Sequence, residues 1–121
     1  MTETPGVKHY DLEDRTLAFA KEARNYVKKL RKTTGNIEDG KQLVRASGSV
    51  GANYIEANEA LSKKDFIMRI KICRKEAKEC RYWLKLTDTQ DEPESENLRN
   101  MLIKEATELM NIFGSILRKS E

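Results

Sequence analysis

The chain has 121 residues, 38% of them hydrophobic and 36% charged, with 23 lysines and arginines against 20 aspartates and glutamates. This length fits one domain, and the composition can form a core if the apolar residues follow an amphipathic pattern. The mild net charge excludes a polycation, and no run approaches the roughly 18 apolar residues of a membrane-spanning helix. Residues 1–10 contain no apolar run, so we also expect no signal peptide.

Charge is distributed unevenly along the chain. Residues 8–32 carry eight Lys and Arg against four Asp and Glu, and residues 62–89 carry nine against four. Residues 36–60 carry two against four, and residues 90–121 carry four against seven. Two basic segments therefore alternate with two acidic segments. In an antiparallel bundle this polarity can stabilise the fold and also create an external field.

The N-terminal part of the chain divides into an arm and a first helix. Residues 1–9 have no apolar periodicity, so we predict a flexible arm before a single domain over residues 10–121. We predict the first helix from about Leu12 to Lys32, ended by a turn with Gly35 near the C′ position. Its expected apolar face comprises Phe19, Ala20, Ala23, Tyr26, Val27 and Leu30.

The second predicted helix begins with Asn36 as N-cap and Asp39 in its first turn. Gly48 and Gly51 lie in its middle, where each glycine costs roughly 1 kcal/mol relative to alanine. Either another helix approaches closely across these small residues, or the helix breaks near Gly48. We predict a continuous helix, because the apolar period resumes in phase after Gly51. Its expected inner positions are Leu43, Val44, Ser47, Gly51, Tyr54, Ile55 and Asn58.

The third predicted helix begins at Ser62, which forms a capping-box-like start with Asp65, and runs to about Thr87. Its apolar or small residues are separated by alternating gaps of four and three, the seam of a coiled-coil-like helix. That seam is Phe66, Ile70, Cys73, Ala77, Cys80, Leu84 and Thr87. Four further apolar residues remain on the outer side and suggest a subunit contact: Met68, Ile72, Tyr82 and Leu86.

The two cysteines, Cys73 and Cys80, are seven residues apart on this helix. That spacing corresponds to about 10.5 Å of helical rise, beyond the roughly 7 Å that a disulfide allows between Cα atoms. We interpret both as small, reduced core residues. Reduced thiols without an export signal predict a cytoplasmic protein.

The fourth predicted helix begins at Pro93, with Glu94 and Glu96 near its positive end. Its expected seam is Leu98, Leu102, Ala106, Leu109, Phe113 and Ile116. Four long helices with short connections predict an all-α fold, an antiparallel up-down-up-down four-helix bundle.

The residues that catalysis needs are not arranged in any recognisable motif. His9 is the one histidine of the sequence, and the paired Glu-x-x-His motifs of bundle di-metal sites do not occur. Glu56 and Glu59 are one turn apart, but solvation or pairing with a neighbouring helix explains two such carboxylates. The segment 48–51 lacks the Gly-Lys-Ser/Thr ending of a phosphate loop. We therefore predict no enzyme, no cofactor and no metal site.

Cations recur at helical spacing on two of the predicted helices. On the third helix they are Lys71, Arg74, Lys78, Arg81 and Lys85. On the first helix they are Lys21, Arg24, Lys28 and Arg31. Steps of three and four residues place each set on one face, so both sets are candidates for binding nucleic acid. The alternative is that both are ordinary solvated faces interspersed with glutamates such as Glu22, Glu76 and Glu79.

Three segments, residues 45–57, 62–66 and 75–84, carry a resemblance to a known family. Their sequences, RASGSVGANYIEA, SKKDF and KEAKECRYWL, resemble the bacterial four helix bundle protein family. That family is known from open reading frames in intervening sequences of 23S rRNA genes, and the accessory proteins of diversity-generating retroelements are similar. The resemblance covers roughly residues 10–118.

This resemblance implies a small antiparallel four-helix bundle that assembles into a ring-shaped homo-oligomer, a pentamer. It implies no enzymatic activity and no cofactor. For the retroelement relatives it implies binding to nucleic acid and to a reverse transcriptase through basic surface.

The function predicted from the sequence is that of a homo-oligomeric scaffold that binds RNA or DNA weakly through its basic helix faces. The alternative is a protein-interaction or assembly module that binds no nucleic acid, with a reverse transcriptase or another protein as partner. In either case the residues expected at the oligomer interface are Gly48, Gly51, Met68, Ile72 and Tyr82.

Overall fold

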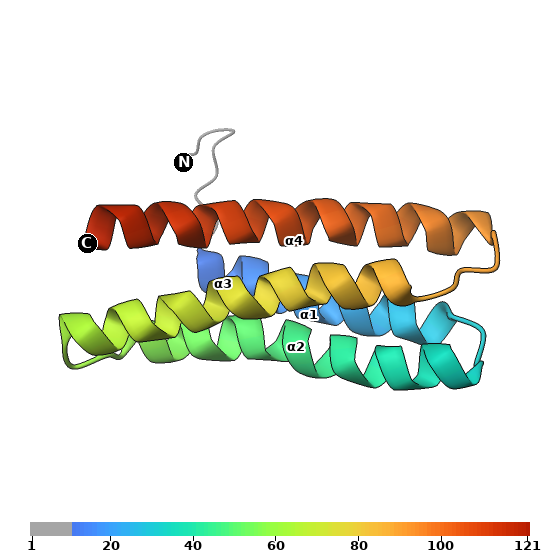
Figure 1. Ribbon diagram of the computed structural model, residues 1–121, viewed down its shortest axis with the longest axis horizontal. Helices are drawn as coiled ribbons and strands as arrows, with labels where there is room; N and C mark the ends of the chain where they lie inside the picture. The colour runs from blue at the N-terminus through green and yellow to red at the C-terminus, as the bar shows by residue number, and fades with distance from the viewer. Residues whose placement is uncertain (1–10) are drawn as a thin grey trace.

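A computed structural model describes residues 11–121, and four helices with short connections form an antiparallel bundle in it (Figure 1). The helices are α1 (Leu12–Lys29), α2 (Thr34–Asn58), α3 (Lys63–Leu86) and α4 (Pro93–Ser120). The predicted all-α up-down-up-down fold is confirmed. The predicted arm over residues 1–9 lies outside the described residues. In the described part of the chain, every helix is too short or too polar to cross a membrane.

The order of the helices around the bundle decides which surfaces can act together. Each helix packs on its neighbours in sequence, and α1 closes the bundle by packing more loosely on α4. The pairs α1 and α3, and α2 and α4, are diagonal and meet only through side chains in the core, such as the rings of Tyr54 and Phe113. In Figure 1 the yellow α3 lies in front of the blue α1. The outer faces of α1 and α3 therefore point in opposite directions.

The core follows the predicted seams on three of the four helices. On α1 the predicted face is buried, with Val27 partly exposed. On α3 the seam is buried from Ile70 to Thr87. On α4 the predicted Leu102, Ala106, Leu109 and Phe113 are buried, whereas Leu98 and Ile116 are half-buried and Leu117, which was not predicted, is buried.

On α2 the predicted inner face is only partly right. Leu43 and Ser47 are buried, but Ile55 is 48% exposed and Asn58 is also exposed. The buried positions that the pattern missed are Ala46, Val50 and Ala57. They are buried because α2 packs between α1 and α3, so its buried arc is wide and includes small residues that let a neighbouring helix come close.

The connection between α1 and α2 differs from the prediction. Leu30 leaves the helical conformation, with φ −70° and ψ 144°, and buries its side chain, so α1 ends at Lys29. Thr33 is the N-cap of α2, since its hydroxyl accepts a hydrogen bond from the backbone N–H of Asn36 at 3.1 Å. Gly35 therefore lies in the first turn of α2 and not at the end of α1.

Asn36 is buried and connects two turns of the bundle instead of capping α2. Its Nδ2 donates to the carbonyl oxygens of Arg31 at 3.0 Å and Asp88 at 2.9 Å. Its Oδ1 accepts a hydrogen bond from the backbone N–H of Asp88 at 2.8 Å. The predicted N-cap role was wrong because this side chain satisfies the turn between α3 and α4, far away in sequence.

The predicted starts of α3 and α4 are confirmed. The Ser62 hydroxyl accepts a hydrogen bond from the backbone N–H of Asp65 at 3.1 Å, which makes Ser62 the N-cap of α3. Pro93 is the first residue of α4, where its missing N–H costs nothing. The side chain of Glu92 caps this helix by accepting from the N–H of Ser95 at 2.9 Å.

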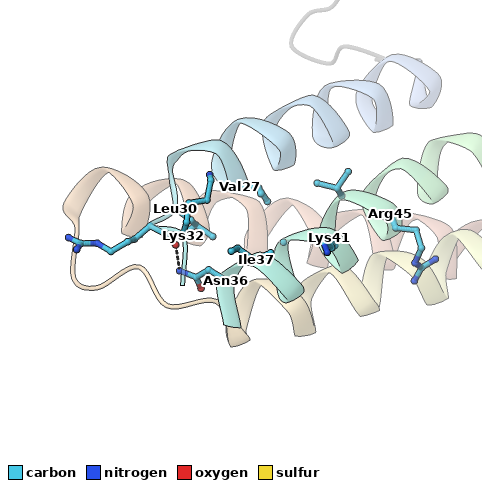
Figure 2. A pocket seen from close by; sticks show the side chains of 10 residues that line it. Val27, Leu30, Lys32, Asn36, Ile37, Lys41 and Arg45 are labelled. Atoms are coloured by element: carbon cyan, nitrogen blue, oxygen red, sulfur yellow. Dashed lines mark hydrogen bonds between the residues drawn. The ribbon is translucent and has the colours of Figure 1, made fainter. Parts of the chain in front are cut away.

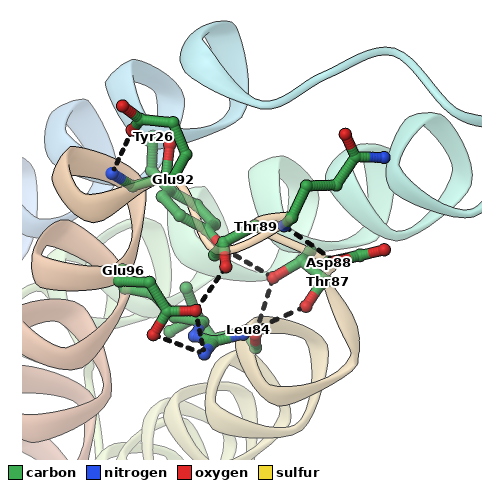
Figure 3. Close-up of polar contacts among 10 residues, drawn as sticks. Tyr26, Leu84, Thr87, Asp88, Thr89, Glu92 and Glu96 are labelled. Carbon is green, nitrogen blue, oxygen red and sulfur yellow. Dashed lines mark hydrogen bonds and ion pairs between the residues drawn. The ribbon is translucent and has the colours of Figure 1, made fainter.

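A polar network buried at the turn between α3 and α4 attaches that turn to α1 (Figure 3). The hydroxyls of Tyr26 and Thr87 are 2.7 Å apart, and Thr87 donates to the carbonyl of Leu84 at 2.6 Å. Tyr26 is therefore the donor of the first bond. Nearby, the Thr89 hydroxyl donates to Glu96. These bonds satisfy polar groups that the core would otherwise leave without partners.

The helix α2 is continuous through both glycines, as predicted. A Cβ atom on Gly51 would lie 2.9 Å from Oγ1 and 3.3 Å from Cβ of Thr16, so the close approach is made by α1. A Cβ on Gly48 would lie 3.5 Å from the guanidinium of Arg24 in α1. The part of these two glycines in an oligomer interface stays a prediction.

Candidate nucleic-acid interface

Four of the five α3 cations predicted to bind nucleic acid are exposed, and the fifth is half-buried. Arg81 is the half-buried member, and its Nη1 donates to Oγ1 of Thr107 in α4 at 3.3 Å. The Nε of Arg81 is buried without a hydrogen-bond partner within residues 11–121. The exposed members are Lys71, Arg74, Lys78 and Lys85.

The α3 cations border the surface where α3 meets α4. Arg81 contacts Thr107, and two turns earlier on α3 the side chain of Arg74 lies beside Gly114 of α4. The two contacts are seven residues apart on both antiparallel helices, so the same sides of α3 and α4 meet along this length. We call this surface the basic face. It comprises Lys71, Arg74, Lys78, Arg81 and Lys85 of α3 and Arg118 of α4.

Arg118 is the member of the basic face that the sequence reasoning missed. Its Nη1 lies 3.6 Å from the point that a Cβ on Gly114 would occupy, and the Nη1 of Arg74 lies 3.9 Å from the same point. A signal for it exists in the sequence. Residues 107, 111, 114 and 118 are spaced by four, three and four, and they place Thr, Asn, Gly and Arg on one side of α4 without a carboxylate.

The cations of the basic face lack acidic partners, whereas Arg15 and Arg45, which lie between other helices, are paired. Among residues 11–121, none of the six forms an ion pair. Between α1 and α4, Arg15 binds Glu105 at 2.7 Å and Glu108 at 2.8 Å. The hydrogen bond from Arg15 to Glu105 raises the pKa of this arginine. The positive charge of the basic face therefore stays available for an external anion.

The surface between α2 and α3 is closed by an ion-paired cluster. Arg45 of α2 lies 3.9 Å from Glu76 and 3.6 Å from Glu79 of α3. Both glutamates were assigned to ordinary solvation from the sequence, yet Glu76 is 8% exposed. Its Oε1 has no hydrogen-bond partner in the described part of the chain. On α3, Glu76 and Glu79 thus face α2, whereas Arg74 and Arg81 of the basic face lie beside α4.

The α1 cations lie on the other side of the bundle from the basic face. All four are exposed, as predicted: Lys21, Arg24, Lys28 and Arg31. The guanidinium of Arg24 donates to the carbonyl of Ala20 at 3.2 Å. Because α1 and α3 are diagonal, the two cationic sets cannot form one surface within a single chain.

A pocket of about 400 Å³ lies near the turn between α1 and α2 (Figure 2). Val27 of α1, Leu30 directly after α1 and Ile37 of α2 supply apolar lining. The cations among its lining residues are Arg31, Lys32, Lys41 and Arg45. Arg31 is the one α1 candidate cation that lines it, so this pocket does not gather the predicted set.

The apolar residues left over on α3 border the basic face, since Tyr82 lies between Lys78 and Lys85 at helical spacing and Met68 lies three residues before Lys71. Met68 is 45%, Tyr82 58% and Leu86 48% exposed, and Ile72 is half-buried. The ring of Tyr82 contacts Trp83 edge-on, with centroids 5.1 Å apart. Helical spacing places these residues around the outer side of α3 and toward α2.

The sulfur and acidic groups of the described residues give no sign of a reactive centre. Both cysteines are free and buried, and burial raises the pKa of Cys73 to about 12 and also raises that of Cys80. Neither thiol therefore forms a nucleophilic thiolate near neutral pH. Within residues 11–121, no group of three or more His, Cys, Asp or Glu could hold a metal ion.

Fold and surface together define a small four-helix-bundle protein with a basic face that forms no ion pair within residues 11–121. The chain belongs to the family of 23S rRNA-intervening sequence proteins, whose family model matches residues 8–115. No curated protein matches the chain in sequence.

The fold is also similar to a solved structure from Bacteroides thetaiotaomicron, a protein of unknown function from the S23 ribosomal protein family. The two share 30% sequence identity with a TM-score of 0.75. The alignment covers 88% of this chain and 98% of that chain. The family and the bundle predicted from the sequence are thereby confirmed.

Proposed function

We propose that this protein is a non-enzymatic, homo-oligomeric scaffold that binds RNA or DNA weakly through the basic face. The observation that carries the proposal is the difference between the bundle surfaces. Arg15 between α1 and α4 and Arg45 between α2 and α3 lie against glutamates, whereas the six cations of the basic face have no acidic partner among residues 11–121.

The spacing of these cations suits a phosphate backbone better than a sequence-specific contact. Lys71, Lys78 and Lys85 follow each other every seven residues, about 10.5 Å along the helix. Cations that neutralise phosphates release condensed counterions, and this supplies affinity without reading bases. We expect the nucleic acid to bind on the outer surface of α3 and α4. Two helices packed side by side form no cleft that could hold a flipped base.

Assembly into an oligomer is compatible with this surface. The exposed apolar residues Met68 and Tyr82 lie away from the side of α3 that faces α4. A subunit contact through them would leave Arg74 and Arg81, which lie beside α4, open on every copy. In a ring such as the pentamer that the family resemblance implies, weak contacts from several copies add through effective concentration.

A second candidate function is a protein-interaction module that binds no nucleic acid, with a reverse transcriptase or another protein as partner. The same apolar residues favour it, because four of them on one helix exceed the scattered singles of an ordinary surface. The two functions differ in which side chains of α3 bind the partner, the cations or the apolar residues, so variants of each set separate them.

The test compares charge reversal on and off the basic face. Lys71, Lys78 and Lys85 are changed together to Glu, and Arg81 is left in place because it is half-buried. The matched control changes three exposed lysines elsewhere, Lys32, Lys41 and Lys119, to Glu. Both variants lower the net charge equally, so only location differs.

Binding to a fluorescent single-stranded RNA is then measured by anisotropy at low salt. We expect the first variant to lose binding by at least about 100-fold, since three phosphate contacts are lost. The control should weaken binding by less than about tenfold through the general field. Equal losses in both variants would reject the basic face and leave the protein-interaction function.

A further inference from the structure

We propose that Arg74 and Arg118 together form a binding site for a single phosphate group, centred over Gly114 of α4. This inference rests on the proposed function, because it names the backbone phosphate of the bound nucleic acid as the ligand. It also identifies Arg74 of α3 and Arg118 of α4 as the residues that bind one phosphate through directed hydrogen bonds, in addition to the general positive field of the basic face.

The geometry of the two arginines is the first argument. Arg74 comes from α3 and Arg118 from α4, yet the Nη1 atoms of both lie within 4 Å of the point where a Cβ on Gly114 would sit. Two guanidinium groups from different helices thus converge over one turn of α4. Each guanidinium carries several N–H donors in a fixed plane, and such donors match the oxygens of a phosphate.

The lack of partners is the second argument. Neither arginine forms a hydrogen bond or an ion pair within residues 11–121, whereas Arg15, Arg45 and Arg99 all pair with glutamates. Like charges that approach each other repel, and an anion between them removes that repulsion. The pair is therefore complementary to an anion that the described chain does not itself supply.

Gly114 is the third argument. It lies in the interior of α4 and is buried, because the two arginine side chains cover it. Glycine lowers helix stability at an interior position, so we expect a structural or binding reason for its presence at this position. A methyl group at the Cβ position would make ordinary contacts, but any longer side chain would extend into the space between the two guanidinium groups, and glycine keeps that space free.

The surrounding face supports a phosphate as the anion. The α4 residues on this side are Thr107, Asn111 and Gly114, which are neutral, and Arg81 lies two turns along α3. A nucleic-acid strand with one phosphate bound at Arg74 and Arg118 would therefore have further cations of the basic face beside its neighbouring phosphates. A carboxylate from a second copy of the chain is the competing anion, and the test distinguishes it.

The test is a double-mutant cycle with Arg74→Gln, Arg118→Gln and the double variant, measured against a short single-stranded RNA at low salt. Each single change should weaken binding by about tenfold, and the double change should cost much less than the product, because both arginines bind the same phosphate. Arg118→Lys should recover only part of the affinity, since one point charge replaces a fork of donors. Lys119→Gln removes the same charge from the next residue of α4 and should change binding by less than about twofold.

Two further variants alter the site without changing charge. Gly114→Ala should bind almost as the unaltered protein does, because its Cβ would make ordinary contacts of 3.6 Å or more. Gly114→Leu should displace both guanidinium groups and reproduce the loss seen for Arg118→Gln. Circular dichroism melting of each variant shows that the bundle remains folded.

The outcomes separate this inference from the proposed function. If the unaltered protein does not bind RNA at low salt, the proposed function fails and the phosphate site fails with it. Two results would overturn the phosphate site alone if the unaltered protein binds RNA. One is that Arg118→Gln changes the affinity no more than Lys119→Gln does. The other is that the loss of affinity in the double variant equals the product of the losses in Arg74→Gln and Arg118→Gln. If Arg118→Gln leaves RNA binding intact and dissociates an oligomer in light scattering, the arginines bind a carboxylate of a second copy, which also overturns the proposal.

Discussion

The hydroxyl oxygen of Thr16 in α1 lies 2.9 Å from the point that a Cβ on Gly51 of α2 would occupy. Thr16 is fully buried and its hydroxyl donates to the carbonyl of Leu12 at 2.7 Å, so it cannot move aside easily. The contact explains why a glycine is present in the middle of α2, where it otherwise lowers helix stability. It also fixes how closely α1 and α2 pack.

Gly51→Ala is therefore expected to lower the free energy of unfolding by about 1–2 kcal/mol, because overpacking outweighs the gain in helix propensity. Gly35→Ala is the matched control, since nothing lies within 4 Å of its Cβ position, and it should be neutral or stabilising by up to about 1 kcal/mol. Urea unfolding of both variants gives the comparison. A stabilised Gly51→Ala would contradict the close approach.

The hydrogen bond between Tyr26 and Thr87 gives a second prediction. Tyr26→Phe should lower the free energy of unfolding by about 1 kcal/mol, because the bond that attaches α1 to the end of α3 is lost while Thr87 keeps its bond to Leu84. Tyr82→Phe removes a hydroxyl from an exposed ring and should leave stability unchanged. If thermal melts show the same change in melting temperature for Tyr26→Phe and Tyr82→Phe, the buried hydrogen bond does not contribute to stability.

Alkaline pH should destabilise the bundle through its buried thiols and phenol. Burial raises the pKa of Cys73 to about 12 and also raises the pKa values of Cys80 and Tyr26. The unfolded chain then loses protons before the folded chain does, so stability is fully present below pH 9 and falls above it. Between its pKa in the unfolded chain and its raised pKa in the folded chain, each such group lowers the free energy of unfolding by about 1.4 kcal/mol per pH unit.

Urea titrations between pH 8 and pH 11 test this. Replacing Cys73 with Ala should make the decline shallower, although the variant is less stable at pH 8 because its side chain is part of the core. A decline of unchanged steepness would mean that Cys73 does not contribute to it.

The apolar side of α3 gives a prediction about assembly. Met68→Glu combined with Tyr82→Glu should dissociate the oligomer, because two charges would be buried in the subunit contact. Leu17→Glu on α1 is a control, since Leu17 is equally exposed at 53%. Light scattering at micromolar concentration measures the mass. A monomeric mass for the unaltered protein would reject the assembly prediction altogether.

The sequence predicted those features that depend on local spacing. The gaps of four and three from Ile70 to Leu84, Ser62 before α3 and Pro93 at the start of α4 are properties of one helix each, and all three are confirmed. The continuity of α2 through Gly48 followed from the phase of its apolar residues.

Features that depend on which helices are neighbours were missed. Thr33 and Asn36 are both good N-caps, and Asn36 is displaced from that role because it bonds with Asp88 in a distant turn. Arg118 was overlooked because its closeness to Arg74 depends on which side of α4 meets α3. For the same reason the two cationic sets could be found in the sequence, but not their placement on opposite sides of the bundle.

If the basic face binds the phosphates of a nucleic acid, the affinity must depend on the salt concentration. The measurement is the affinity of the unaltered protein for single-stranded RNA over a series of salt concentrations. If three to six cations contact phosphates, the log of the affinity should fall against the log of the salt concentration with a slope of about −2 to −4. Binding that does not change with salt, or no binding at the lowest salt concentration, would contradict the claim.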